Sequence, residues 1–149
     1  MRYTTEVTIG LPRAKVVELF DSTENLYKWQ AGLKAIEPIS GTRGQPGATS
    51  RMVFHEGDER VELIETITSR NLPNELAVTY ESKGIINHMD YQFHEEEEEE
   101  KTRVVVVSEY RFSGFMKLVA PFMGDAFTRE TASQMSAFKE FAESLKTQP

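Results

Sequence analysis

The chain has 149 residues, of which 39% are hydrophobic and 28% are charged, a composition typical of a single globular domain over residues 1–149. No apolar run approaches the ~20 residues that span a bilayer and no signal-peptide core opens the chain, so neither membrane insertion nor secretion is expected. The absence of cysteine excludes disulfides and thiolate metal sites and favours a cytoplasmic location. The net charge of −7 comes mostly from an acidic block at residues 95–100, and the nearly neutral remainder lacks the basic surface that nucleic-acid binding requires.

The first part of the chain is predicted to form a strand, two short helices and a second strand. Pro12 suits the first position of a helix, and Asp21-Ser22 ends that helix and caps the next one. Alternating β-branched residues favour the first strand. The strands are expected over residues 4–9 and 33–39, and the helices over residues 12–20 and 23–29.

The middle of the chain is predicted to be a succession of hairpins. Glycine in the first turn position favours a type II′ turn at Gly57-Asp58, whereas Lys83-Gly84 is a weaker type I′ signal because lysine rarely adopts the left-handed conformation. The strands are expected over residues 48–56, 59–69, 75–82, 85–95 and 102–112.

A helical period follows Gly114 and continues to about Leu145, with Pro121 marking the start of a long helix. Antiparallel strands followed by segregated helices predict an α+β fold, in which the long helix covers a curved sheet. One helix face comprises Met123, Phe127, Thr131, Gln134, Phe138, Phe141 and Leu145. A slightly rotated face that uses Met135 and Ala142 is an equal alternative.

The hairpin turns also predict which side chains face the interior, because cross-strand partners share a face. About the first turn Ser50 lies opposite Glu65, and about the second Tyr80 lies opposite Asn87. The inward set is Met52, Phe54, Val61, Leu63, Glu65, Ile67, Leu76, Val78, Tyr80, Asn87, Met89, Tyr91, Phe93, Val106, Ser108, Tyr110 and Phe112.

Several members of this inward set are polar, and a dry core rarely holds so many polar groups without partners. A cavity between the sheet and the long helix accounts for them, because small-molecule sites are mainly apolar with a few placed polar groups. The alternative is a solid core in which the tyrosine hydroxyls reach the rim and Glu65 sits at a bulge or an edge.

The residues that most often carry chemistry give few signals. His55, His88 and His94 fall on the outer face, so neither a metal site nor a catalytic triad is predicted, and no cofactor is expected. The acidic block at residues 95–100 is interpreted as the solvated tip of a hairpin. Glu65 is the candidate acid or base, since burial among apolar residues raises the pKa of a carboxyl group.

Loose packing patterns run along nearly the whole chain, at residues 10–12, 16–20, 25–30, 47–48, 63–67 and 138–143. They resemble those of the START/polyketide cyclase-like (SRPBCC) superfamily of helix-grip proteins, and in particular its bacterial-type members. The resemblance implies a seven-stranded antiparallel sheet around a C-terminal helix, with lipids, sterols, polyketides or aromatic molecules bound between them. Some members are aromatases, cyclases or dehydratases, but no catalytic set of theirs is recognisable here.

The leading hypothesis is therefore a non-enzymatic protein that binds a small apolar molecule between the sheet and the C-terminal helix. The alternatives are a cyclase- or dehydratase-like enzyme that uses Glu65, and an interaction module that uses Val105 and Val107 on the outer face. No nucleic-acid partner is expected, and a homodimer is possible.

Trp29 either plugs the cavity mouth or fixes the second helix to the sheet. The candidate ligand-binding residues are Trp29, Phe54, Leu63, Glu65, Tyr80, Asn87, Met89, Tyr91, Ser108, Tyr110, Met123, Phe127 and Thr131.

Overall fold

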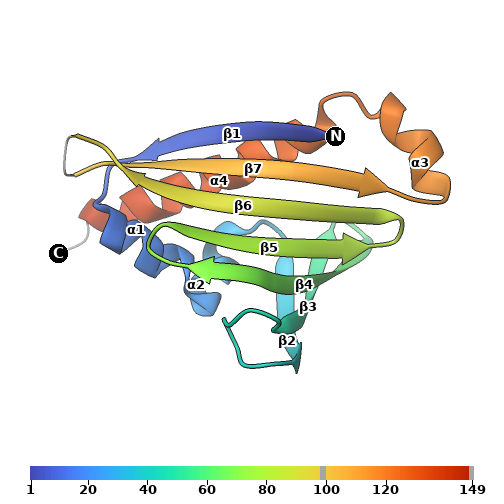
Figure 1. The fold of residues 1–149 in the computed structure, drawn as a ribbon, viewed down its shortest axis with the longest axis horizontal. Coiled ribbons are helices and arrows are strands. Elements are labelled where there is room, and N and C mark those ends of the chain that lie inside the picture. Colours follow the sequence, from blue (N-terminus) through green and yellow to red (C-terminus); the bar gives the residue numbers. More distant parts are fainter. Residues whose placement is uncertain (98–99, 148–149) are drawn as a thin grey trace.

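The computed structural model describes residues 1–97 and 100–147, which form one seven-stranded antiparallel sheet in the order β1-β7-β6-β5-β4-β3-β2 (Figure 1). The strands are β1 (Arg2–Ile9), β2 (Leu33–Ser40), β3 (Thr49–Glu56), β4 (Glu59–Asn71), β5 (Glu75–Ser82), β6 (Ile85–Glu95) and β7 (Thr102–Phe112). The helices are α1 (Arg13–Phe20), α2 (Thr23–Trp29), α3 (Phe115–Val119) and α4 (Ala126–Ser144), with 3₁₀ turns η1 (Ala120–Phe122) and η2 (Leu145–Thr147).

The first two strands of the sequence lie at opposite edges of this sheet, and α1 and α2 connect them. The sheet is strongly curved, and α1, α2 and α4 all lie on the same side of it (Figure 1). This arrangement confirms the predicted α+β helix-grip fold with two short helices and a long C-terminal helix.

The short helices begin and end close to their predicted limits. Ser22 caps α2, with its hydroxyl oxygen accepting a hydrogen bond from the Asn25 backbone N–H at 3.2 Å. Pro12 does not occupy the first helical position as predicted. Its ψ of 151° is extended, so Pro12 is the residue that precedes α1.

The strand register agrees with the prediction at both hairpins, since Ser50 pairs with Glu65 and Tyr80 with Asn87. Gly57 has a φ of 62° and Asp58 has a negative φ, as the predicted type II′ turn requires. The type I′ prediction for the second turn is wrong. Lys83 keeps a negative φ and only Gly84 is left-handed, at 74°, which is the pattern of a type II turn.

A bulge in β4 changes which side chains face inward beyond Ile67. The register shifts by one residue between Ile67 and Ser69, so that Arg70 pairs with the inward-facing Leu76. Simple alternation from Glu65 would place Arg70 on the outer face. The bulge instead directs a guanidinium group to the concave side of the sheet.

The main core forms where α1, α2 and α4 meet the central strands, and Phe20 at the end of α1 lies at its centre. The ring centroid of Phe20 lies 4.8 Å from that of Tyr91, 5.4 Å from that of Phe93 and 5.3 Å from that of Phe138. Trp29 completes the cluster, with its ring centroid 5.1 Å from that of Phe138. These contacts hold both short helices between the sheet and α4.

The long helix uses the rotated face. Met135 and Ala142 are buried, while Gln134 is only half-buried and donates to the Glu130 side chain at 3.4 Å. The predicted start at Pro121 is also wrong, because Pro121 lies in η1 and α4 begins after the left-handed Gly124.

The outer face of the sheet carries the histidines, as predicted, and His55, His88 and His94 are all exposed. If the long helix covered the inward set as predicted, Met52 and Phe54 would face α4, and this expectation is wrong. Both are buried on the inner side, but they form a separate cluster with Leu33 and pack against Leu26 of α2.

The structure describes only part of the acidic block, because residues 98–99 lie outside the described residues. Two of its carboxylates form ion pairs, Glu95 with Arg13 at 3.5 Å and Glu96 with Arg103 at 3.1 Å. The block is therefore tied to α1 and β7, whereas the sequence predicted only a solvated tip. Among the described residues, no helix has both the length and the hydropathy needed to cross a membrane.

Candidate functional site

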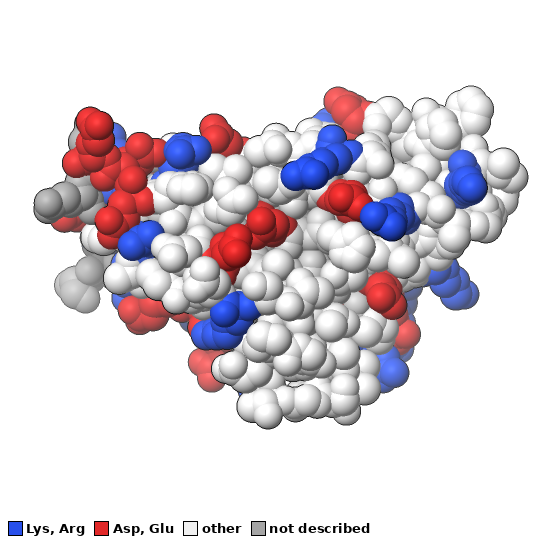
Figure 2. Space-filling view, in the orientation of Figure 1, with Lys and Arg blue, Asp and Glu red and all other residues white. Residues whose placement is uncertain are grey.

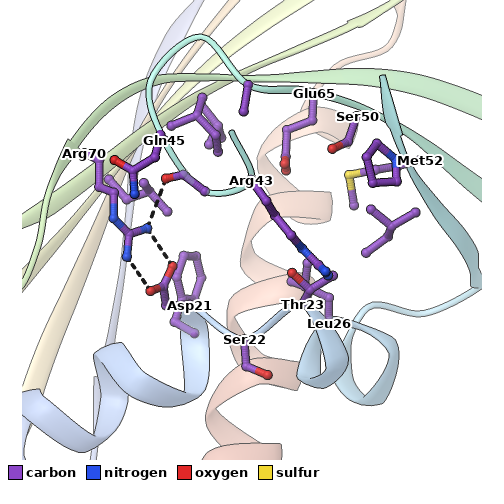
Figure 3. Close-up of a pocket in the computed structure, with 18 of the residues that line it drawn as sticks. Asp21, Ser22, Thr23, Leu26, Arg43, Gln45, Ser50, Met52, Glu65 and Arg70 are labelled. Atoms are coloured by element: carbon purple, nitrogen blue, oxygen red, sulfur yellow. Dashed lines mark hydrogen bonds and ion pairs between the residues drawn. The ribbon is translucent and has the colours of Figure 1, made fainter. Parts of the chain in front are cut away.

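The candidate site is a cavity of about 340 Å³ on the concave side of β2–β5, bounded by the junction of α1 with α2 and by the loop that follows β2 (Figure 3). Its lining comprises Phe20, Asp21, Ser22, Thr23, Leu26, Gln30, Ile36, Pro38, Arg43, Gly44, Gln45, Ala48, Ser50, Met52, Glu65, Ile67, Arg70, Leu76, Val78, Tyr80 and Tyr91. No residue of α4 belongs to this set. The predicted position of the cavity, between the sheet and the C-terminal helix, is therefore corrected.

The apolar part of the cavity wall comes from the middle of the sheet. Ile67 on β4 and Leu76 and Val78 on β5 are buried and face the concave side, and Phe20 closes the wall toward α4. A continuous apolar surface of this kind suits an acyl chain or an aromatic ring.

A carboxyl group is placed against this apolar wall. Glu65 on β4 is partly buried, pairs with Tyr80 on β5 and directs its carboxyl group into the cavity (Figure 3). Burial raises the pKa of Glu65 above its usual range, and a hydrogen bond with Tyr80 partly opposes that increase. The pKa of Tyr80 is itself raised by burial and by the nearby carboxyl group. The sequence thus predicted the direction of the Glu65 shift correctly.

A clamp on one side of the cavity mouth joins α1 to β4. Arg70 donates from Nη2 to Asp21 Oδ2 at 2.6 Å and from Nη1 to Asp21 Oδ1 at 2.9 Å, and Nη1 also reaches the Gly44 carbonyl oxygen at 3.3 Å (Figure 3). This two-pronged ion pair fixes the end of α1 and the loop in one arrangement. Sequence reasoning missed it, because only the β4 bulge turns Arg70 inward.

A second arginine lies over the mouth. Arg43, on the loop between β2 and β3, extends across the opening toward Thr23 and Leu26 (Figure 3). Unlike Arg70, Arg43 has no acidic partner within the described part of the chain. The mouth therefore presents one cation that is not neutralised, along with the hydroxyl groups of Ser22 and Thr23.

Of the candidate ligand-binding residues, Glu65, Tyr80 and Tyr91 line the cavity. Trp29 does not plug the mouth, and its stacking with Phe20 and Phe138 fixes α2 to the core. Three further candidates do not line the cavity. Phe54 and Leu63 belong to the second apolar cluster, and Met89 belongs to the main core.

The remaining candidates lie in the half of the interior that α4 fills. The Tyr3 hydroxyl on β1 donates to the Phe127 carbonyl oxygen at 2.6 Å and lies 2.9 Å from Thr131 Oγ1. The ring of Tyr110 packs 4.6 Å from that of Phe127, between centroids. These contacts fill the space between α4 and this part of the sheet. A separate hollow of about 440 Å³ lies beside Tyr110 and Phe112, against Lys117, Ala120 and Pro121 of α3 and η1. Asn87, Ser108 and Met123 belong to the same half, and the side-chain oxygens of Asn87 and Ser108 are buried without a hydrogen-bond partner in the described structure.

Metal binding has little support in the site. Within the described residues, no group of three His, Asp or Glu side chains is arranged to hold a metal ion. The polar groups of the cavity are instead suited to hydrogen bonding and proton exchange with an organic ligand.

Comparison with known proteins identifies related sequences and folds. A family model described as "Polyketide cyclase / dehydrase and lipid transport" matches residues 1–146. No curated protein matches the chain. The fold is similar to TTHA0849 from Thermus thermophilus, at 17% identity and a TM-score of 0.77, with 99% of this chain and 100% of that chain covered.

Two similar structures are enzymes. The Zhui aromatase/cyclase from Streptomyces sp. R1128 has 11% identity and a TM-score of 0.77, covering 96% of this chain and 93% of that chain. Norcoclaurine synthase from Thalictrum flavum, in complex with dopamine and hydroxybenzaldehyde, has 14% identity and a TM-score of 0.72, covering 100% of this chain and 88% of that chain. At these identities the likeness establishes the fold alone.

The raised pKa of Glu65 predicts how stability depends on pH. The folded state binds the Glu65 proton more tightly than the unfolded state does, so this group lowers the stability progressively as pH rises above the unfolded pKa near ~4.3, until the folded pKa is passed. Glu65→Gln removes this loss, so the variant gains stability relative to the wild type over that interval and keeps the gain at higher pH. Urea denaturation of both proteins from pH 4 to 9 measures the difference.

Glu62→Gln is the matched control, because Glu62 is exposed on the outer face of the same strand. Its stability difference from the wild type is expected to show no such rise. Parallel stability curves for Glu65→Gln and the wild type at all pH values would contradict the assignment of a raised pKa.

Proposed function

The chain belongs to the polyketide cyclase / dehydrase and lipid transport family, and from that premise we propose that it binds a small, mainly apolar molecule in the cavity between β2–β5 and the α1–α2 junction. The ligand is a lipid, sterol, polyketide or aromatic molecule that carries a polar end. A cytoplasmic location forms part of the same proposal.

The observation that carries this proposal is the division of the cavity into an apolar wall and a polar mouth. Ile67, Leu76 and Val78 provide the wall, and a volume of about 340 Å³ falls within the range of small-molecule sites. Removal of apolar ligand surface from water supplies most of the affinity in such a site, and the few polar groups orient the ligand.

The polar groups support one orientation of the ligand. Arg43 lies over the mouth without an acidic partner in the described structure, whereas Glu65 lies deeper, against apolar side chains. An anionic or strongly polar end is therefore stabilised at the mouth beside Arg43, and the apolar body lies against the sheet. The similar norcoclaurine synthase structure contains small aromatic molecules, which supports a ligand of that kind here.

Catalysis by Glu65 is a second candidate function. The observation that favours it is a carboxyl group of raised pKa beside the Tyr80 hydroxyl in a cavity, an arrangement that suits proton transfer. In a dehydration, the Glu65 carboxylate would take the proton from the carbon beside a carbonyl group. The resulting carboxylic acid would return that proton to the departing hydroxyl group, which leaves as water.

The third hypothesis is an interaction surface on the outer face, formed by Val105 and Val107. Val105 is only 8% exposed, so it offers little surface to a partner. Val107 is partly buried as well. We therefore do not carry this function forward.

Blocking the cavity is expected to abolish ligand binding. Ser50 is partly buried on β3 and lines the cavity, so Ser50→Trp places an indole in the space that the ligand needs. Isothermal titration calorimetry with decanoic acid is expected to show a loss of affinity of about 10-fold or more, or roughly 1.4 kcal/mol.

Arg51→Trp is the control for this experiment, because Arg51 is the next residue of β3 and faces the opposite side of the sheet. Its affinity for decanoic acid is expected to match that of the wild type. Unchanged binding by Ser50→Trp, with both variants folded, would place the ligand elsewhere.

Replacing Arg43 is expected to change ligand selectivity. Arg43→Gln removes the charge that faces the ligand's polar end, so affinity for decanoic acid should fall about 3- to 10-fold while affinity for 1-decanol stays constant. Arg60→Gln, which removes an exposed arginine from the outer face, serves as the control. An equal loss of affinity for the acid and the alcohol would refute the role of Arg43 in charge recognition.

The catalytic candidate is tested with a β-hydroxyketone, 4-hydroxy-4-phenylbutan-2-one, whose dehydration produces an enone that absorbs in the ultraviolet. If Glu65 acts in proton transfer, Glu65→Gln lowers turnover by about 10²-fold or more and leaves decanoic acid binding nearly unchanged. Equal rates for the variant and the wild type, or no turnover above the uncatalysed rate, would remove catalysis and leave ligand binding as the function.

A further inference from the structure

A patch of apolar side chains is exposed on α3 and η1, away from the cavity. Phe115 is 76% exposed, Leu118 is 71% exposed and Phe122 is 89% exposed, the highest values for large hydrophobic side chains among the described residues. We call these three residues the α3 patch. Single exposed apolar side chains are common on protein surfaces, but a cluster of three within eight residues indicates an interaction site.

The α3 patch lies on one side of a segment whose other side is attached to the sheet. The three residues are spaced three and four apart, which places them along one face of the segment formed by α3 and η1. On the other side, Met116 packs so closely on the β5–β6 turn that a Cβ atom at Gly84 would lie 3.1 Å from Met116 Cβ. The patch therefore points outward because its segment is held by contacts on the opposite side.

Basic side chains accompany the α3 patch. Lys117 lies on α3, and Lys83 lies in the turn against which α3 packs. The sequence contains no acidic residue from position 110 to position 124. The acids that flank this stretch are already paired, Glu109 with Arg111 at 3.0 Å and Asp125 with Arg129 at 3.2 Å.

Charged side chains are unevenly distributed along the long axis on the face that Figure 2 shows. Figure 2 shows red acidic side chains gathered at the end where the tip between β6 and β7 lies, and a mainly white surface with blue side chains at the α3 end. A negatively charged surface would repel the acidic end and attract the α3 end, so the protein would approach it with the α3 patch leading.

We propose that α3 and η1 form a docking element for an anionic lipid surface. Phe115, Leu118 and Phe122 enter the boundary between head groups and acyl chains, and Lys83 and Lys117 lie against the lipid phosphates. The proposal concerns surface attachment and does not rest on ligand binding in the cavity. It proposes where in the cell the protein acts, namely at a lipid surface, for a chain whose family includes lipid transport.

A second copy of this chain is a less suitable occupant of the α3 patch. A two-fold contact through the patch would place both copies of Lys117 in one interface, where their like charges repel. An anionic bilayer complements the apolar side chains and the lysines at the same time.

Vesicle flotation tests the proposal with the full chain. The wild type is expected to float with vesicles of phosphatidylcholine and phosphatidylglycerol, and at least about 10-fold less with phosphatidylcholine alone. Phe122→Ser is expected to lower flotation several-fold, and the triple variant Phe115→Ser/Leu118→Ser/Phe122→Ser to abolish it. Because these side chains are mostly exposed, the variants should keep the wild-type melting temperature.

Two controls separate the contributions. Ile39→Ser removes another exposed apolar side chain, 50% exposed at the end of β2, and should leave flotation unchanged. Lys83→Gln/Lys117→Gln should remove the preference for anionic vesicles.

Three outcomes would overturn the proposal. One is a wild type that floats with neither vesicle, and another is a triple variant that floats as well as the wild type. The third is a wild type that sediments as a dimer, binds no vesicles and becomes a monomer in the triple variant. That result would assign the α3 patch to an interface between two copies.

Discussion

The packing of Phe20 between the sheet and α4 decides how the interior of this protein is divided. Its ring contacts Tyr91 and Phe93 on β6 and Phe138 on α4, so the space between helix and sheet is solid at this point. Phe20 also forms part of the cavity lining. The same side chain is therefore the centre of the core on one side and the wall of the cavity on the other. A smaller residue there would extend the cavity into the core.

The charges around the cavity follow from this division. The Arg70–Asp21 ion pair connects the end of α1, where Phe20 lies, to the bulged part of β4. The two-pronged geometry of this pair positions α1 and the loop relative to β4. Because Asp21 neutralises Arg70, the cation of Arg43 is left to meet a ligand, and Glu65 stays in an apolar setting that disfavours its charged form.

The parts of the structure that local rules determine could be predicted from the sequence. Two-residue turns set the register of both hairpins, and alternation then placed Glu65, Tyr80 and Tyr91 on the inner face. Alternation failed at Arg70, because a bulge adds one residue without a sequence signal that a single chain reveals. It also could not tell which half of the inner face stays open. That depends on how the rings of Phe20, Trp29 and Phe138 fill space, a property of packed side chains and not of periodicity.

We propose that a small apolar ligand occupies the β2–β5 side of the concave face and not the α4 side. Two-dimensional ¹H–¹⁵N NMR of the full chain during titration with decanoic acid locates the ligand directly. The largest shifts are expected at the amides of Ser50, Glu65 and Val78, while Thr131 and Tyr110 change little. Dominant shifts at Thr131 and Tyr110, or no localised shifts at saturating ligand, would contradict this proposal.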